Sequence, residues 1–196
     1  MSNTCCTDIY IYSEDEKGLI EMNKALEIAD PRKIKTTWVQ YVGEKLGLCK
    51  VKGCHAYDEN DEFISAESRI VNHDVHTQFL HIGCYDSWNP HFKLYDMMAK
   101  KFLSDYKFLY ESCEPSEDLF VSNKPEVAGT WTVMVNDGEF EGGNEEYMQT
   151  ENAIAHLNGL LKINMATMRE IEEYIDRNDI DIKIYQYEEV PYEDYC

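Results

Sequence analysis

The chain has 196 residues, of which 43% are hydrophobic and 12% aromatic, a composition typical of one folded domain or of one domain with an appendage. It carries 38 acidic and 18 basic residues, and the net charge of −20 repels nucleic acids and anionic membranes. No apolar run approaches the roughly 18 residues that a membrane span needs, and the N-terminal sequence MSNTCCTDIY lacks the regions of a signal peptide. We therefore expect a cytoplasmic protein that keeps its seven cysteines as reduced thiols.

Hydrophobic periodicity over the first 115 residues predicts alternating strands and helices. Alternation with a period of two indicates strands, and recurrence every three or four residues indicates helices. The expected strands cover residues 5–12, 63–71, 79–85 and 107–113, and the expected helices cover residues 13–29, 37–46 and 90–102. Residues 31–61 are interpreted as an insertion, in which the acidic run 58–62 forms a polar turn.

Two of the expected helices have recognisable starts. Ser13 and Glu16 have the spacing of a capping box, and Asn89 is an N-cap with Pro90 at the first helical position. Trp88 and Pro90 are expected to anchor this later helix on the sheet. The order of elements is that of a ferredoxin-like split βαβ sandwich, an α+β fold in which helices cover one face of an antiparallel sheet.

The C-terminal third predicts additional strands and one long helix. Strands are expected at residues 119–122 and 130–135 and around Ile180, Ile182 and Ile184. The seam of the long helix consists of Ile154, Leu157, Leu161, Met165, Met168, Ile171 and Ile175. We expect this seam to pack on the protein's own sheet, in a monomer, whereas a seam exposed on the surface would make a homodimer.

These elements predict three parts of the chain. Residues 1–136 form the core, and residues 137–188 form an acidic extension, with a helix and a last strand, packed on that core. Residues 189–196 are acidic and aromatic and are expected to form a mobile tail.

Cysteines, histidines and carboxylates provide weak candidates for enzymatic or metal chemistry. The possible zinc ligands are Cys49, Cys54, His55, His73, His76, His81 and Cys84, but their spacing matches no standard zinc motif. Cys84 close to His91 would be the candidate for a catalytic thiol. Acidic residues that cluster near a strand end are Glu111, Glu114, Glu117 and Asp118. We assign no catalytic residue, metal or cofactor, and keep a small cytosolic enzyme or metal-binding protein as the alternative.

Several short motifs resemble one protein family. Trp88-x-Pro90 is followed by an amphipathic helix and a strand that ends in Glu114-Pro115, and Gly129 precedes an aromatic strand. Over roughly residues 1–136 this pattern resembles the YubB-type ferredoxin-like proteins of plasmids and phages. The resemblance implies a ferredoxin-like fold and a mobile genetic element as the setting. That family has no established catalytic residues to carry over.

Charge and resemblance together predict a non-enzymatic acidic interaction protein. Residues 137–196 contain 16 acidic and four basic residues, a net charge of −12. A rigid array of carboxylates can occupy the basic groove of a nucleic-acid-binding defence protein, such as a CRISPR effector or a restriction enzyme. The expected partner-binding residues are Asp137, Glu139, Glu141, Glu145, Glu146, Glu170, Glu173 and Asp176. We expect no direct binding of nucleic acid or membrane. A dimeric scaffold or antitoxin-like protein is a further alternative.

Overall fold

The computed structural model describes residues 4–27, 38–135, 139–140 and 146–196, and the chain forms two compact units. Unit 1 comprises Met1–Leu119 and Val190–Cys196, and unit 2 comprises Phe120–Glu189. The division therefore falls at residue 119 rather than at the expected residue 136, and the last seven residues belong to unit 1. The architecture is mixed α+β with mostly antiparallel strand pairing, which confirms the α+β class.

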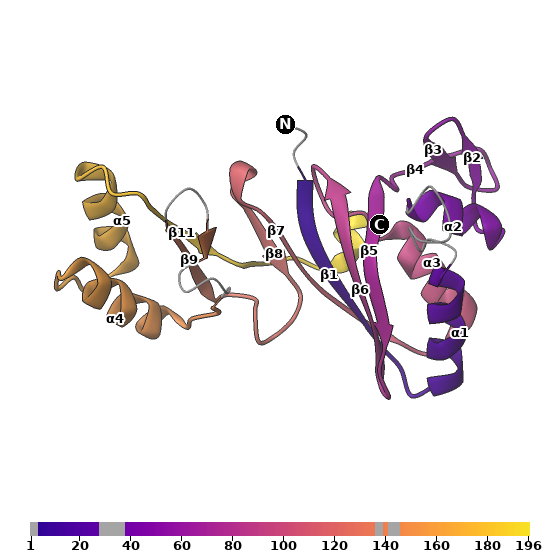
Figure 1. The fold of residues 1–196 in the computed structure, drawn as a ribbon, viewed down its shortest axis with the longest axis horizontal. Coiled ribbons are helices and arrows are strands. Elements are labelled where there is room, and N and C mark those ends of the chain that lie inside the picture. The colour runs from indigo at the N-terminus through magenta and orange to yellow at the C-terminus, as the bar shows by residue number, and fades with distance from the viewer. Residues whose placement is uncertain (1–3, 28–37, 136–138, 141–145) are drawn as a thin grey trace. The chain divides into compact units, whose positions relative to one another are not determined.

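Unit 1 is built on a four-stranded antiparallel stretch of sheet with β1 near its centre (Figure 1). The order is β7-β1-β6-β5, formed by β7 (Lys107–Glu114), β1 (Thr4–Tyr12), β6 (Phe79–Ser87) and β5 (Ser68–Val75). The helices α1 (Glu16–Leu26), α2 (Val39–Lys45) and α3 (Lys93–Phe102) lie together on one face of this sheet. A 3₁₀ turn, η2 (Pro115–Glu117), follows β7.

Alternation along β1 explains why the helices cover one face only. Ile9 and Ile11 are fully buried, whereas Asp8, Tyr10 and Tyr12 on the opposite face are half-buried. Burying each such isoleucine contributes about 1.5–3 kcal/mol. The apolar period of two thus fixes which face of the sheet receives α1, α2 and α3.

The predicted insertion, residues 31–61, contributes two strands to a small separate sheet, and the third strand follows it directly. The sheet consists of β2 (Lys50–Lys52), β3 (His55–Tyr57) and β4 (Phe63–Ile64), paired antiparallel in that order. The single strand expected over residues 63–71 is therefore two strands, β4 and β5, which belong to different sheets. The acidic run is a turn, as predicted, because the Asp58 carboxylate accepts hydrogen bonds from the amides of Asn60 and Glu62, each at 2.8 Å.

Both predicted helix starts are shifted towards the C-terminus. The N-cap of α1 is Asp15, whose carboxylate accepts from the Gly18 amide at 2.9 Å, because the Ser13 hydroxyl donates to Asp105 instead. The N-cap of α3 is Phe92 rather than Asn89. Phe92 is fully buried against Phe108 and Tyr110, so tertiary packing sets where this helix begins.

The C-terminal tail packs on unit 1, in contrast to the free tail that its charge suggested. The Tyr110 hydroxyl donates to the carbonyl of Val190 at 2.9 Å, and the Phe92 amide donates to the carbonyl of Tyr195 at 3.0 Å. Tyr192 stacks on Phe108 with ring centroids 4.6 Å apart. Its aromatic residues therefore hold the tail, which forms a short 3₁₀ helix, η4 (Tyr192–Tyr195).

Unit 2 combines two helices with short strands. Its elements are β8 (Leu119–Ser122), β9 (Trp131–Val135), β10 (Glu139–Phe140), α4 (Thr150–Leu161), α5 (Met168–Arg177), β11 (Ile182–Gln186) and β12 (Glu188–Glu189). The strands β10, β9 and β11 form an antiparallel sheet in that order, and β12 pairs with β8 in parallel.

The prediction of one long C-terminal helix is wrong, because α4 and α5 are separate helices. Lys162 ends α4 in the left-handed region at φ 54°. The Asn158 side chain then holds Met165 through two backbone hydrogen bonds of 2.8 and 2.9 Å. Thr167 and Glu170 form a capping box that starts α5.

The predicted seam residues nevertheless share one core. Leu157, Met168, Ile171 and Ile175 are buried with Val133 of β9, and the remaining seam residues pack around them. The seam is therefore part of the interior of unit 2.

A buried polar network lies under α3 in unit 1. Asp86 is 1% exposed and accepts hydrogen bonds from the side chains of Ser68 and Thr7. Ser68 also shares a hydrogen bond of 2.9 Å with the Tyr95 hydroxyl. Burial raises the pKa of Asp86 to about 6, although these hydrogen bonds oppose the shift.

We predict that Asp86 makes the stability of the protein pH-dependent between about pH 4 and about pH 6. As the pH rises through this window, the unfolded carboxyl loses its proton before the folded one, so the free energy of unfolding falls. In Asp86→Asn this contribution is absent. The difference in free energy of unfolding between the two proteins should therefore change across the window and become constant above it. Urea denaturation of both proteins at several pH values measures this difference. If the free energies of unfolding of the two proteins change in parallel over the whole pH range, Asp86 titrates with its ordinary pKa.

Candidate functional site

The structure brings together only part of the predicted acidic surface. Asp137, Glu141 and Glu145 lie outside the described residues, and Glu139 is described only as backbone in β10. Glu146 is exposed shortly before α4. The three remaining residues, Glu170, Glu173 and Asp176, lie on one helix, α5.

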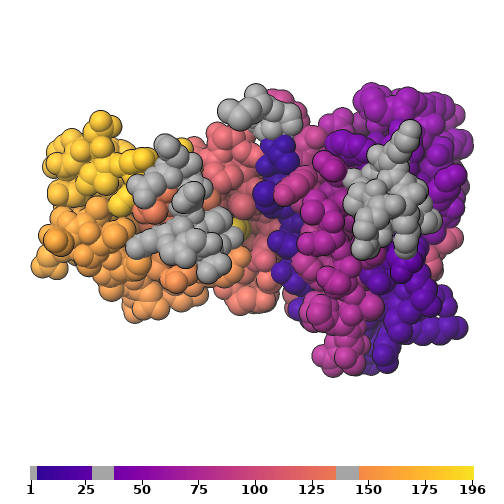
Figure 2. Space-filling model, in the orientation of Figure 1, coloured from indigo at the N-terminus to yellow at the C-terminus, as the bar shows by residue number. Residues whose placement is uncertain are grey.

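Packing fixes which side of α5 is exposed. Met168, Ile171 and Ile175 recur at helical spacing and are buried in the core of unit 2, so the helix cannot turn about its axis. Glu173 and Asp176 are therefore held towards solvent. Figure 2 shows this part of the chain, coloured from orange to yellow, at the surface of unit 2.

Two of the three predicted carboxylates on α5 already have partners. Glu170 accepts from the amides of Ala166 and Thr167 at 2.9 and 3.0 Å, and these hydrogen bonds lower its pKa. Glu173 forms an ion pair of 2.9 Å with Arg169. Asp176 has no ion pair with any described residue. Half-buried Glu172 on the same helix was not predicted as a binding residue, although the acidic pair at 172–173 is visible in the sequence.

The charge density of α5 alone is well below that of a nucleic acid. Its ten residues contain four carboxylates and two arginines, and they span about 15 Å. A DNA duplex of that length carries about nine negative charges. An acidic surface able to compete with DNA must therefore extend beyond α5. Unit 2 as a whole has 15 acidic and five basic residues, a net charge of −10.

The candidate zinc ligands have separate environments. His73 hydrogen-bonds Asn23 at 2.8 Å, and His81 pairs with Asp8 at 2.6 Å on the sheet face away from the helices. Cys54 lies 3.6 Å from His55 in an exposed turn. Within the part of the chain that is described, no three His, Cys, Asp or Glu side chains lie close enough to hold a metal ion.

Cys84 lacks the environment of an activated thiol. It is 3% exposed, and both burial and the neighbouring Asp86 carboxylate raise its pKa well above the ordinary value. His91, the predicted base, uses both ring nitrogens elsewhere, since Nδ1 shares a hydrogen bond with the Ser65 hydroxyl and Nε2 donates to the carbonyl of Ser87.

The carboxylates near the end of β7 stabilise local structure. Glu114 is buried and accepts hydrogen bonds from the Thr4 amide at 2.7 Å and from the amide and hydroxyl of Ser116. The Tyr10 hydroxyl donates to Glu111 at 3.3 Å. Asp118 occupies the left-handed region at φ 54°. These hydrogen bonds give Glu114 and Glu111 structural roles.

A cleft of about 1080 Å³ in unit 1 was not predicted from the sequence. Its walls come from the β3–β4 turn and β4, from the turn before α3, and from the C-terminal tail. We call it the unit 1 cleft, and its polar and aromatic lining includes Asp58, Glu59, Glu62, Phe63, Ser65, Asn89, His91, Lys93, Asp194 and Tyr195. Ser65 and His91 share a hydrogen bond of 2.7 Å across two of these segments. The polar turn was visible in the sequence, but its position beside the tail was not.

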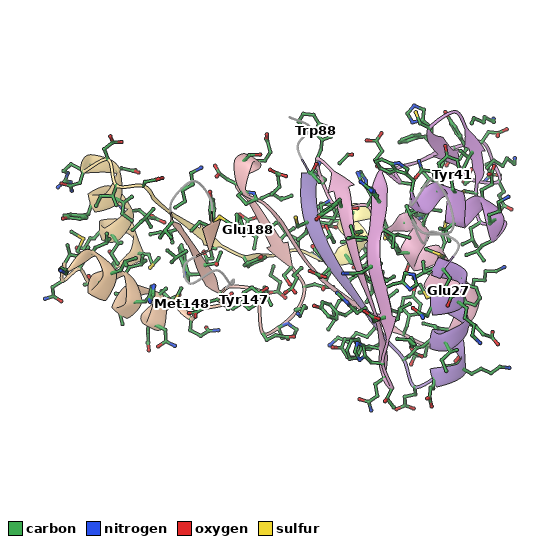
Figure 3. All side chains as sticks on the ribbon, in the orientation of Figure 1. Glu27, Tyr41, Trp88, Tyr147, Met148 and Glu188 are labelled. Atoms are coloured by element: carbon green, nitrogen blue, oxygen red, sulfur yellow. The ribbon has the colours of Figure 1, made fainter. Side chains whose placement is uncertain are left out.

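Trp88 does not anchor α3, in contrast to the expectation. It is 60% exposed and projects beyond the end of the sheet of unit 1 (Figure 3). Its backbone adopts the left-handed region at φ 70°, which is unfavourable for a bulky side chain. The next residues, Asn89 to His91, line the unit 1 cleft.

Comparison with known proteins identifies no relative of this chain. No family model, no curated protein and no solved structure matches it. Among the described residues, no helix has both the length and the apolar character needed to cross a membrane.

We predict that thiol alkylation separates the cysteines by burial. At about pH 8, iodoacetamide should modify Cys6 and Cys54, two of the three exposed cysteines, and leave the buried Cys5, Cys49 and Cys84 unmodified until the protein unfolds. Burial raises the pKa of Cys5 to about 12 and that of Cys49 to about 11, so few thiolates are present. Mass spectrometry of native and denatured samples measures the pattern. Selective modification of native Cys84 would instead support the catalytic thiol.

Proposed function

We propose that this chain is a non-enzymatic acidic interaction protein that binds a basic protein surface. The observation that carries the proposal is the fixed orientation of α5, whose buried face of Met168, Ile171 and Ile175 keeps a row of carboxylates outward. Preorganised charges lose little conformational freedom on binding and steer an oppositely charged partner over long distances. The net charge of −20 supports the same class of partner.

The proposed partner is a nucleic-acid-binding defence protein of a bacterial host, such as a CRISPR effector or a restriction enzyme. Such proteins have basic grooves that hold a phosphate backbone. The carboxylates of unit 2, whose net charge is −10, would occupy that groove and exclude the nucleic acid. The setting in a phage or plasmid rests on the resemblance to the YubB-type proteins.

Unit 1 is proposed to be a ferredoxin-like domain. The strand order β7-β1-β6-β5 with antiparallel neighbours, and helices α1 and α3 on one face, supports this assignment. The small sheet formed by β2, β3 and β4 would then be an insertion between the first helix and the second strand of that fold. A stable domain of this kind would provide the scaffold for the acidic surfaces.

We predict that the protein displaces labelled DNA from a basic target enzyme and that charge reversal in unit 2 strongly weakens this effect. A panel of purified CRISPR effectors and restriction enzymes, each bound to fluorescent duplex DNA, provides the targets. Displacement measured by fluorescence anisotropy should weaken steeply from about 50 to about 200 mM salt. Reversing four carboxylates to lysine should reduce it about tenfold or more. The four changes are Glu146→Lys, Glu172→Lys, Glu173→Lys and Asp176→Lys.

A matched control separates the local surface from total charge. Glu14→Lys, Glu21→Lys, Asp74→Lys and Asp105→Lys change the net charge by the same amount on exposed positions of unit 1. This control should retain displacement. Equal losses in both variants would refute a specific role of the unit 2 surface, and failure to displace DNA from any target would refute the proposed inhibition. Circular dichroism of each variant verifies that it is folded.

A further inference from the structure

The unit 1 cleft combines a negative lining with little internal neutralisation. Asp58 uses its carboxylate to hold the turn, but Glu59, Glu62 and Asp194 form no ion pair with any described residue. Among the described lining residues, Lys93 is the one lysine or arginine. Lys50, outside the lining, donates to the carbonyl of Glu59 at 3.3 Å and pairs with Asp61 rather than with Glu59 or Glu62. A cationic group that entered the cleft would therefore meet carboxylates from two segments of the chain that are distant in sequence.

One wall of the cleft is held in a defined position. The carbonyl of Ser87 can only accept, so His91 donates to it from Nε2 at 2.9 Å, and Nδ1 shares its hydrogen bond with Ser65. This pair connects the segment after β4 to the turn before α3. The hydrogen bond from the Phe92 amide to the Tyr195 carbonyl joins the tail that carries Asp194 to the same turn before α3.

One exposed aromatic side chain lines the cleft, and a second belongs to the residue that precedes the lining segment 89–91. Phe63 lines the cleft and is 58% exposed. Trp88 immediately precedes the lining residues Asn89 to His91 and is 60% exposed. Its left-handed backbone is unfavourable for a bulky side chain, and such strain is found preferentially at functional sites. Exposed aromatic side chains beside unpaired charges are typical of the anchors of protein interfaces.

We propose that the unit 1 cleft binds an arginine side chain of a basic protein partner. A planar guanidinium can form paired hydrogen bonds with Glu62 or Asp194 and stack on an aromatic ring such as Phe63, whereas a lysine ammonium offers only a point charge. A second copy of this chain is a poor occupant, because each copy carries a net charge of −20. This inference rests on the proposed function and adds a specific contact in unit 1 to the surface of unit 2.

Nuclear magnetic resonance with short capped peptides tests this site directly. The probes are three glycine- and leucine-containing peptides that differ at one central residue, which is arginine, lysine or the neutral analogue citrulline. At about 150 mM salt, the arginine peptide should shift the amide signals of residues 59–65, 89–93 and 194–196 of the full chain. It should bind about five- to tenfold more tightly than the lysine peptide, and the citrulline peptide should not bind.

Matched variants distinguish the cleft from the overall charge. The double variant Glu62→Gln with Asp194→Asn should weaken binding of the arginine peptide about tenfold or more. Glu172→Gln with Asp176→Asn, which removes the same charge from unit 2, should leave binding unchanged. Phe63→Ala should weaken binding of the arginine peptide, whereas Phe63→Tyr should bind it as the unaltered protein does, because the ring is retained. Unperturbed signals elsewhere in unit 1 verify that each variant is folded.

The outcomes separate this inference from the proposed function. Absence of arginine-peptide binding, or equal weakening by the two double variants, overturns the cleft site. If DNA displacement persists in Glu62→Gln with Asp194→Asn, the unit 2 surface is sufficient and the cleft contact is refuted as part of the interface. If peptide binding at the cleft is as predicted but no target enzyme is displaced from DNA, the site stands and the proposed inhibition fails.

Discussion

The central position of β1 is the constraint on which unit 1 depends. This strand pairs with β6 on one side and with β7 on the other, and its alternate residues Thr7, Ile9 and Ile11 are buried under the helices. A shift of the register by one residue would place these side chains on the opposite face and expose the polar set of Asp8, Tyr10 and Tyr12 to the core. The positions of α1 and α3, and hence of the turn before α3, follow from this register.

The polar groups buried beside β1 specify one arrangement of the surrounding strands rather than adding much to the net stability. Asp86, Ser68 and Thr7 satisfy one another in the interior, and such satisfied networks require one arrangement of the surrounding strands. The same network contains Cys84, whose sulfur lies 3.8 Å from the Asp86 carboxylate. Cys84, the candidate for a catalytic thiol in the sequence, is therefore part of the core.

Charge has different consequences in the two units. In unit 2, capping and ion pairing occupy Glu170 and Glu173, so the number of acidic residues overstates the charge available to a partner. In unit 1, a smaller group of carboxylates lies in a cleft whose described lining contains one lysine, Lys93, and the exposed ring of Phe63. Geometry and partners, more than the count of acidic residues, decide where a basic protein would bind most specifically.

The type of most elements, the burial pattern of the strands and the strongly acidic character could be predicted from the sequence, because each depends on neighbours a few residues apart or on composition. The strand at residues 119–122 and the apolar seam of unit 2 are examples. Three features could not be predicted in this way: Phe92 starts α3, the aromatic tail packs on unit 1, and Asp194 shares a cleft with Glu62. These features arise from contacts between segments distant in the chain, which local periodicity does not encode. The break between α4 and α5 is intermediate, since the capping box at Thr167 and Glu170 was present in the sequence but the apolar seam continued across it.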